Sequence, residues 1–149
     1  MKRWIPVAVV AAALFVINVI GRVAAAVFVD ADDTGTQNLL GIVGAGVMTV
    51  AAIGVGVWWS MRMPMQSLIP RLGSALLLGT LAAVLLGPLT VGGNPFAGGA
   101  GLVLAELAMF AALLLVGAFL GYLGATVAGA DYRGRNLKRV ERHYGRKGR

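Results

Sequence analysis

The stretch from Trp4 to Val29, WIPVAVVAAALFVINVIGRVAAAVFV, decides how this chain folds. Two strongly polar side chains, Asn18 and Arg22, interrupt an otherwise apolar run. A helix of about 20 mostly apolar residues is long enough to cross the hydrocarbon core of a bilayer. The stretch therefore predicts a membrane-spanning helix over residues 4–29.

Three further stretches of the same kind follow, over residues 39–59, 72–91 and 102–128. Short linkers separate them, so neighbouring helices should run antiparallel. The third span is expected to begin just after Pro70, and Pro88 is expected to loosen or end its helix. The pattern predicts an all-α protein, with an integral membrane four-helix bundle in residues 1–130 and a basic cytoplasmic tail in residues 131–149.

The composition of the chain supports a membrane protein. The 149 residues are 58% hydrophobic and 13% charged, with a mean hydropathy of +0.83. Soluble domains have about a quarter of their residues charged. A water-soluble fold of this size could not hide so much apolar surface, which excludes that class.

The basic residues indicate the orientation of the spans. Lys2 and Arg3 precede the first span, Arg62 and Arg71 lie in the second linker, and the tail holds most of the rest. These three segments fall on one side of a four-span chain, and the positive-inside rule makes that side cytoplasmic. Both termini are therefore expected in the cytoplasm, and the richness in Ala, Gly, Val and Arg points to a bacterial inner (plasma) membrane.

The N-terminus also has features of a cleavable signal peptide, with a basic start followed by an apolar run. Its apolar core, residues 5–21, is 17 residues long. The usual core of a signal peptide is about 7–15 residues. A retained first span is therefore the favoured interpretation, and cleavage would leave three spans.

Small residues recur at four-residue spacing along the third and fourth spans. The two rows are Ala75, Gly79, Ala83 and Gly87 in the third span, and Gly117, Gly121 and Ala125 in the fourth. In lipid, close backbone approach rather than apolar burial brings helices together. We expect these rows to pack inside the bundle, and a homodimer seam is the alternative.

The side chains that would cost the most free energy to place in a bilayer are Asn18, Arg22 and Glu106. Asn18 and Arg22 are four residues apart and share one face of a helix. At a rise of 1.5 Å per residue, Arg22 lies about 10 Å before the outer end of its span, and Glu106 about 6 Å after the outer start of its own. We therefore predict an ion pair between the first and fourth helices, with Asn18 as a hydrogen-bonding neighbour.

Two alternatives for these residues stay open. The charged side chains could reach the outer headgroups by snorkelling. The three residues could also line a transport path, because charges inside membrane spans are often functional.

Residue types that carry catalysis are scarce. The chain has no cysteine, which excludes disulfides, thiolate metal sites and cysteine nucleophiles. The one histidine, His143, lies in the tail, and the glycines of the second span lack the lysine of a phosphate-binding loop. We expect no enzymatic activity, no metal and no cofactor.

The tail concentrates the positive charge of the chain. Leu137, Val140 and Tyr144 recur in it at helical spacing, which is typical of a helix lying along a membrane surface. Anionic lipids at the inner surface are the expected partner; a protein partner is an alternative, and nucleic acid is less favoured. The residues expected to make the contact are Arg133, Arg135, Lys138, Arg139 and Arg142.

These patterns favour a non-catalytic polytopic membrane protein, an accessory or assembly subunit of a bacterial membrane complex. Its partners would be the lipid bilayer and other membrane subunits, or further copies of itself. The alternative is a small homo-oligomeric transporter or channel with Asn18, Arg22 and Glu106 on the path.

Overall fold

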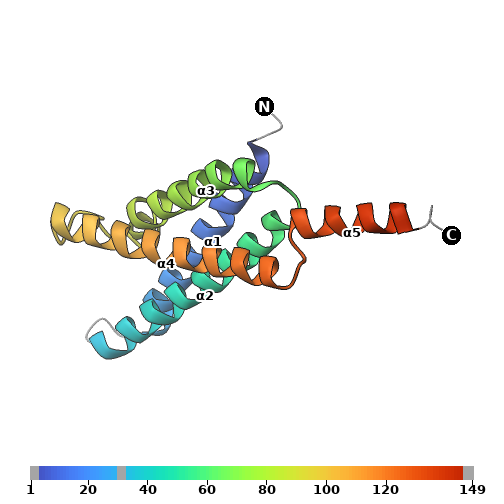
Figure 1. Cartoon of the computed structure of the whole chain (residues 1–149). Helices are drawn as coiled ribbons and strands as arrows, with labels where there is room; N and C mark the ends of the chain where they lie inside the picture. Colours follow the sequence, from blue (N-terminus) through green and yellow to red (C-terminus); the bar gives the residue numbers. More distant parts are fainter. Residues whose placement is uncertain (1–3, 30–32, 146–149) are drawn as a thin grey trace.

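The computed structural model describes residues 4–29 and 33–145, and in these ranges every regular element is helical (Figure 1). Four of the α-helices, α1 to α4, are long and apolar enough to cross a membrane, as the sequence predicted. The elements are α1 (Ile5–Phe28), α2 (Thr34–Ser60), α3 (Met65–Leu85), the 3₁₀ helix η1 (Pro88–Val91), α4 (Ala100–Val127) and α5 (Tyr132–Gly145).

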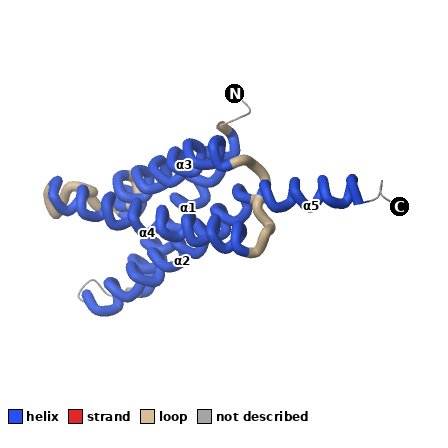
Figure 2. The backbone as a smooth tube through the Cα atoms, viewed as in Figure 1, coloured by secondary structure: helices blue, strands red, loops and turns tan. Residues whose placement is uncertain are grey.

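The four long helices run up and down, so the connections alternate between two ends of the bundle. The start of α1, the α2–α3 connection and α5 lie together at one end, which we call the termini end (Figure 1). The end of α1, the start of α2 and the α3–α4 connection lie at the other end, which we call the loop end (Figure 2). Both ends of the described chain therefore emerge on one side.

The bundle consists of two tightly packed pairs. α2 packs chiefly on α4 and α1 chiefly on α3, while α1–α2 and α3–α4 contacts join the pairs. The buried hydrophobic side chains are Val7, Val10, Leu14, Met48, Ala52, Trp59, Leu68, Leu72, Ala75, Leu76, Ala83, Val84, Val103, Phe110, Leu114, Ala118 and Ala125. Many large apolar side chains on the outer faces stay exposed, as lipid-facing positions would.

The predicted small-residue row of the fourth span forms the α2–α4 contact. A β-carbon on Gly117 would lie 2.8 Å from the carbonyl oxygen of Thr49, and one on Gly121 would overlap the backbone of Ile53. Ala125, the third member of the row, is also buried. The structure places this row inside the bundle, where glycine lets two backbones touch.

The row of the third span also faces inward. Ala75 and Ala83 are fully buried, and a β-carbon on Gly79 would press on the side chain of Leu14 at 3.0 Å. Gly87 ends the row against α1. Both rows are therefore seams within one chain, and neither is free on the surface of a single copy.

The helix of the third span begins earlier than the predicted start of that span, residue 72. α3 begins at Met65, after Pro64 in an extended conformation, and Pro70 lies inside the helix. The hydroxyl of Ser67 donates to the carbonyl of Pro64 at 3.0 Å and supports the first turn. Pro70 lies in the second turn of α3, where its missing amide removes one intrahelical hydrogen bond.

The second helix also begins earlier than the predicted residue 39. Asp33 caps it, and the amide of Thr36 donates to the Asp33 carboxylate at 3.0 Å, so α2 starts at Thr34. The expectation for Pro88 is confirmed: α3 ends at Leu85, and Pro88 opens the short 3₁₀ turn. The first and fourth helices keep their predicted limits to within about two residues, which is the normal uncertainty of helix ends.

The connection between α4 and α5 is a tight turn. Gly129 has a φ of 60°, in the left-handed region that glycine enters without strain. The amide of Ala130 donates back to the carbonyl of Ala125, and the amide of Gly134 donates to the carboxylate of Asp131, which caps α5. The tail is therefore a separate helix that points away from the bundle (Figure 1).

Candidate functional site

The structure brings Asn18, Arg22 and Glu106 together, and we call these three the polar cluster. Arg22 Nε donates to Asn18 Oδ1 at 3.1 Å, and Arg22 Nη2 lies 4.0 Å from Glu106 Oε2. The side chains of Arg22 and Glu106 remain 28% and 37% exposed in the single chain. The two charged groups are thus close enough to form an ion pair, as predicted. The contact is long, however, and it joins only one nitrogen of Arg22 to one oxygen of Glu106.

The direction of the Arg22 side chain explains this geometry. Side chains on a helix lean toward its N-terminus. Because α1 and α4 run in opposite directions, Arg22 leans toward the middle of the bundle and Glu106 toward the loop end. The lean also brings Arg22 back onto Asn18, one turn earlier, rather than out toward the loop end where a snorkelling side chain would go.

Two further residues, which the sequence did not single out for this site, lie against the polar cluster. Met48 of α2 is 1% exposed, and its sulfur accepts a long contact of 3.9 Å from Asn18 Nδ2. A β-carbon on Gly87 would lie 2.6 Å from Asn18 Oδ1 and 2.9 Å from Arg22 Nε. The absence of a side chain at Gly87 therefore makes room for the polar groups of α1.

Around the polar cluster, contacts thus come from α1, α2 and α4 and from Gly87 in the short connection that follows α3. Met48 carried no signal in the sequence, since a methionine in an apolar helix is typical core. Gly87 carried a signal only as the last member of a small-residue row. To predict that Met48 of α2 lies beside Asn18, one would first have to know how α1 and α2 pack against each other.

Toward the termini end, the core beside this cluster is apolar. Leu14 of α1, Leu72 and Leu76 of α3 and Leu114 of α4 are buried there. Thr80 Oγ1 is buried without a hydrogen-bond partner among the described residues. The bundle interior therefore holds no continuous line of polar groups in the part of the chain that the structure describes.

The termini end carries the basic residues of the α2–α3 connection and of α5. The guanidinium of Arg62 lies 4.5 Å above the ring of Trp58, a cation–π contact. Arg135 of α5 donates through Nη2 to the sulfur of Met61 at 3.4 Å, which ties α5 to the end of α2. Arg133 is exposed on the first turn of α5.

The other predicted tail contacts have a less complete description. Lys138, Arg139 and Arg142 lie within the α5 helix, but their side chains lie outside the described part of the structure. The apolar positions Leu137 and Val140 are 62% and 52% exposed. α5 therefore presents apolar side chains that stay exposed among the described residues.

Among the described residues of the loop end, Asp33 has a clearly shifted pKa. The hydroxyl and the amide of Thr36 both donate to its carboxylate, and these bonds lower the pKa of Asp33 below its ordinary value. A carboxylate at a helix N-terminus gains stability in the same way. This is a capping role.

Metal-binding chemistry finds no support in the described ranges. Within residues 4–29 and 33–145, no group of three or more His, Asp or Glu side chains lies close enough to hold a metal ion.

Comparison of the chain with protein-family models, with curated proteins and with solved structures found no match. No relative therefore lends this chain a substrate, a partner or an activity. Its function has to be inferred from the residues and contacts described above.

Proposed function

We propose that the chain is a multi-pass protein of the bacterial inner membrane with both termini in the cytoplasm. Four helices of sufficient length and apolarity support insertion. The basic residues of the α2–α3 connection and of α5 share the termini end, which favours that end as the cytoplasmic one. The loop end would then face the outside.

Within that membrane, we infer a non-catalytic accessory or assembly role. The observation that carries this proposal is the placement of the polar cluster. Arg22 contacts both Asn18 and Glu106, and buried apolar side chains fill the bundle toward the termini end. An ion that entered at the cluster would have to displace Leu14 and Leu114 to continue.

The outer surface supports the same role. Each long helix presents large exposed apolar side chains, among them Ile20, Ile42, Leu77 and Phe119. Such a surface suits lipid or the spans of other subunits, since both present hydrocarbon. The rows of small residues, by contrast, already pack against other helices of the same chain.

A homo-oligomeric transporter or channel is the second candidate. The partial exposure of Arg22 and Glu106 favours it, because the cluster is not fully enclosed by one chain. In an oligomer, the exposed edges of several clusters could face a shared path. Such charges in membrane spans are commonly functional.

Purification of the tagged chain from native membranes at low detergent, followed by mass spectrometry and by ion-flux assays in liposomes, separates the two. The accessory role predicts foreign membrane subunits in fixed stoichiometry and no flux from the chain alone. A homo-oligomer whose flux is abolished by Arg22→Met would contradict it. A matched variant at a lipid-facing position, Leu104→Met, controls for nonspecific leakage.

A further inference from the structure

The charged groups of the polar cluster are only partly satisfied within one chain. Arg22 uses Nε to donate to Asn18, and its Nη2 comes no closer than 4.0 Å to Glu106 Oε2. Among the described residues, no other hydrogen bond or ion pair reaches the guanidinium or the carboxylate. A guanidinium carries several N–H donors and a carboxylate two acceptor oxygens, so most of this hydrogen-bonding capacity is free in a single copy.

The free capacity is reached from outside the bundle. On α4, Glu106 stands in one row with Leu102, Met109 and Leu113, at spacings of three and four residues. All three of these apolar side chains are exposed. The side chains of Glu106 and of Arg22 on α1 are themselves partly exposed. The two charges therefore form a polar edge on an otherwise apolar outer surface.

In the proposed membrane location, this polar edge lies among lipid tails. Arg22 is about 10 Å and Glu106 about 6 Å inside the outer ends of their spans. Hydrocarbon offers no hydrogen bonds, so free charged groups at such a depth are costly. The bond to Asn18 also holds Arg22 toward the middle of the bundle, away from the outer headgroups. The edge therefore requires a partner with polar groups inside the membrane.

A second copy of the chain brings the charges that match this edge. The two charged groups lie 4.0 Å apart, so their depths in the membrane differ by no more than that distance. A two-fold rotation about the membrane normal keeps depth and exchanges the two sides of the edge. Arg22 of each copy then faces Glu106 of the other, as in any isologous contact. A foreign span with one acidic or one basic residue would instead leave a charge unpaired.

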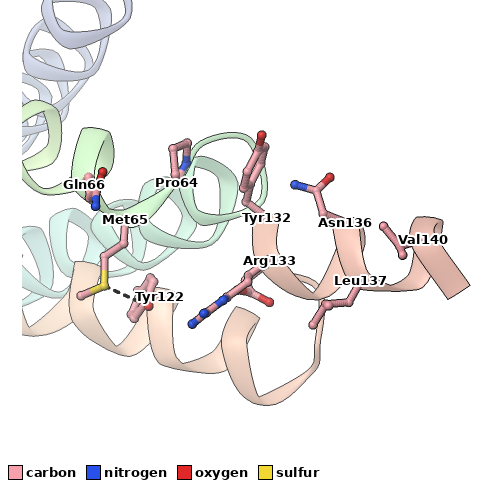
Figure 3. Close-up of a pocket in the computed structure, with 10 residues that line it drawn as sticks. Pro64, Met65, Gln66, Tyr122, Tyr132, Arg133, Asn136, Leu137 and Val140 are labelled. Atoms are coloured by element: carbon pink, nitrogen blue, oxygen red, sulfur yellow. Dashed lines mark hydrogen bonds between the residues drawn. The ribbon is translucent and has the colours of Figure 1, made fainter.

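The groove beside α5 has no such complementarity. It lies at the termini end between α5 and the ends of α3 and α4, with a volume of about 570 Å³ (Figure 3). Its lining has one arginine, Arg133, and one aspartate, Asp131, whose carboxylate accepts the amide of Gly134. The exposed Leu137 and Val140 lie where α5 points away from the bundle. Neither charge nor depth selects an occupant for this groove.

We propose that two copies of the chain associate through the polar cluster, in a two-fold contact that pairs Arg22 of each copy with Glu106 of the other. The exposed row of Leu102, Met109 and Leu113 flanks the charges and covers the pairs with apolar side chains. Pairing across the contact closes the polar edge, which suits an assembly subunit better than a channel. This inference rests on the proposed membrane insertion.

Energy transfer between labelled copies in phosphatidylcholine liposomes tests the contact. The chain has no cysteine, so a single cysteine in place of the exposed Gln66 takes a donor or an acceptor dye without background labelling. The full-length chain is reconstituted over a range of protein-to-lipid ratios. The test variants are Arg22→Gln, Arg22→Glu and Glu106→Arg. Arg62→Gln is the matched control, since it removes a positive charge outside the polar cluster.

The native chain should show energy transfer with the concentration dependence of a dimer. Arg22→Gln should weaken association about ten-fold or more, because a two-fold contact loses two polar pairs at once. Arg62→Gln should have no effect. Arg22→Glu and Glu106→Arg should each fail to associate alone and should associate when mixed, because one copy then brings two acidic groups and the other two basic groups. A pair confined to one chain predicts no such rescue.

Three results would overturn the proposal. A native chain that stays monomeric at every protein-to-lipid ratio has no such contact. Undiminished association of Arg22→Gln would place the contact elsewhere. Absence of association between the two charge-reversed variants, each shown by circular dichroism and liposome flotation to be helical and inserted, would confine the ion pair to one chain. Failure of the native chain to insert would instead contradict the membrane location on which the contact depends.

Discussion

Gly121 of α4 lies so close to Ile53 of α2 that a β-carbon on the glycine would overlap the backbone carbonyl of Ile53. In the proposed membrane location apolar burial does not drive helices together, so close backbone contacts such as this one are expected to stabilise the α2–α4 pair. The contact also explains why small residues recur on that face of α4.

Gly121→Ala should therefore destabilise the bundle by about 1–3 kcal/mol, as overpacking of a filled interior does. Gly124→Ala, on the same helix with nothing within 4 Å of its would-be β-carbon, is the matched control. It should be neutral or gain up to about 1 kcal/mol from the better helix propensity of alanine. Unfolding by SDS in mixed micelles measures both, and equal effects would contradict the seam.

The polar cluster predicts coupling between Arg22 and Glu106. Arg22→Ala and Glu106→Ala should each lower the free energy of unfolding, because each leaves a partner charge without its counterpart. The double change should cost less than the sum, with a coupling of about 0.5–3 kcal/mol. The long, partly exposed contact places the value in the lower part of that range.

The control for this cycle combines Arg22→Ala with Gly124→Ala, two changes with no shared contact. These effects should add within about 0.5 kcal/mol. If the Arg22 and Glu106 losses also add, the two charges act separately, and snorkelling becomes the better account.

Thr80 predicts a stabilising substitution. Its hydroxyl is buried and lacks a partner among the described residues, which carries a desolvation cost of about 1–3 kcal/mol. Thr80→Val keeps the branched shape and removes the oxygen, so the melting temperature in detergent should rise. Thr126→Val is the control, since the Thr126 hydroxyl donates to the carbonyl of Tyr122 and should give no gain. A lower melting temperature for Thr80→Val would show that the Thr80 hydroxyl stabilises the folded chain and would contradict this prediction.

Asp33 predicts a pH-dependent first turn of α2. The bonds from Thr36 lower the pKa of Asp33 in the folded chain, so folding favours the charged form. The capping contribution is then complete above the ordinary pKa of about 3.8 and is lost as the pH falls through the lower folded value.

Amide hydrogen exchange at Thr36 and Gln37 between pH 6 and pH 3, corrected for intrinsic rates, measures this loss. Protection should fall with pH in the native chain. Asp33→Asn keeps a capping oxygen but does not titrate, so its protection should stay constant over the same range. A similar fall in the Asn variant would assign the change to another group.

Apolar length and small-residue spacing predicted the four long helices and the inward-facing rows. Counting residues from the ends of the first and fourth spans also predicted that Arg22 and Glu106 share a level. The early start of α3 was missed because Pro70 was treated as a helix breaker, whereas the extended Pro64 ends the preceding connection. The role of Met48 and the groove beside α5 depend on helix pairing and on the turn at Gly129, which no local pattern encodes.

The last prediction concerns the proposed orientation of the bundle in the membrane, with the loop end outside and the termini end in the cytoplasm. A reporter that is active only outside the cytoplasm, inserted at Asn94 between η1 and α4, should be active, and the same reporter fused after Arg149 should be inactive. A cytoplasm-active fluorescent reporter should give the opposite pattern. Asn94 and the tail are separated by one crossing of α4, so the two sites must differ in side if α4 spans the membrane. Activity on the same side for both would remove a crossing, and the antiparallel α1–α4 arrangement that sets Arg22 against Glu106 could then not lie within the bilayer.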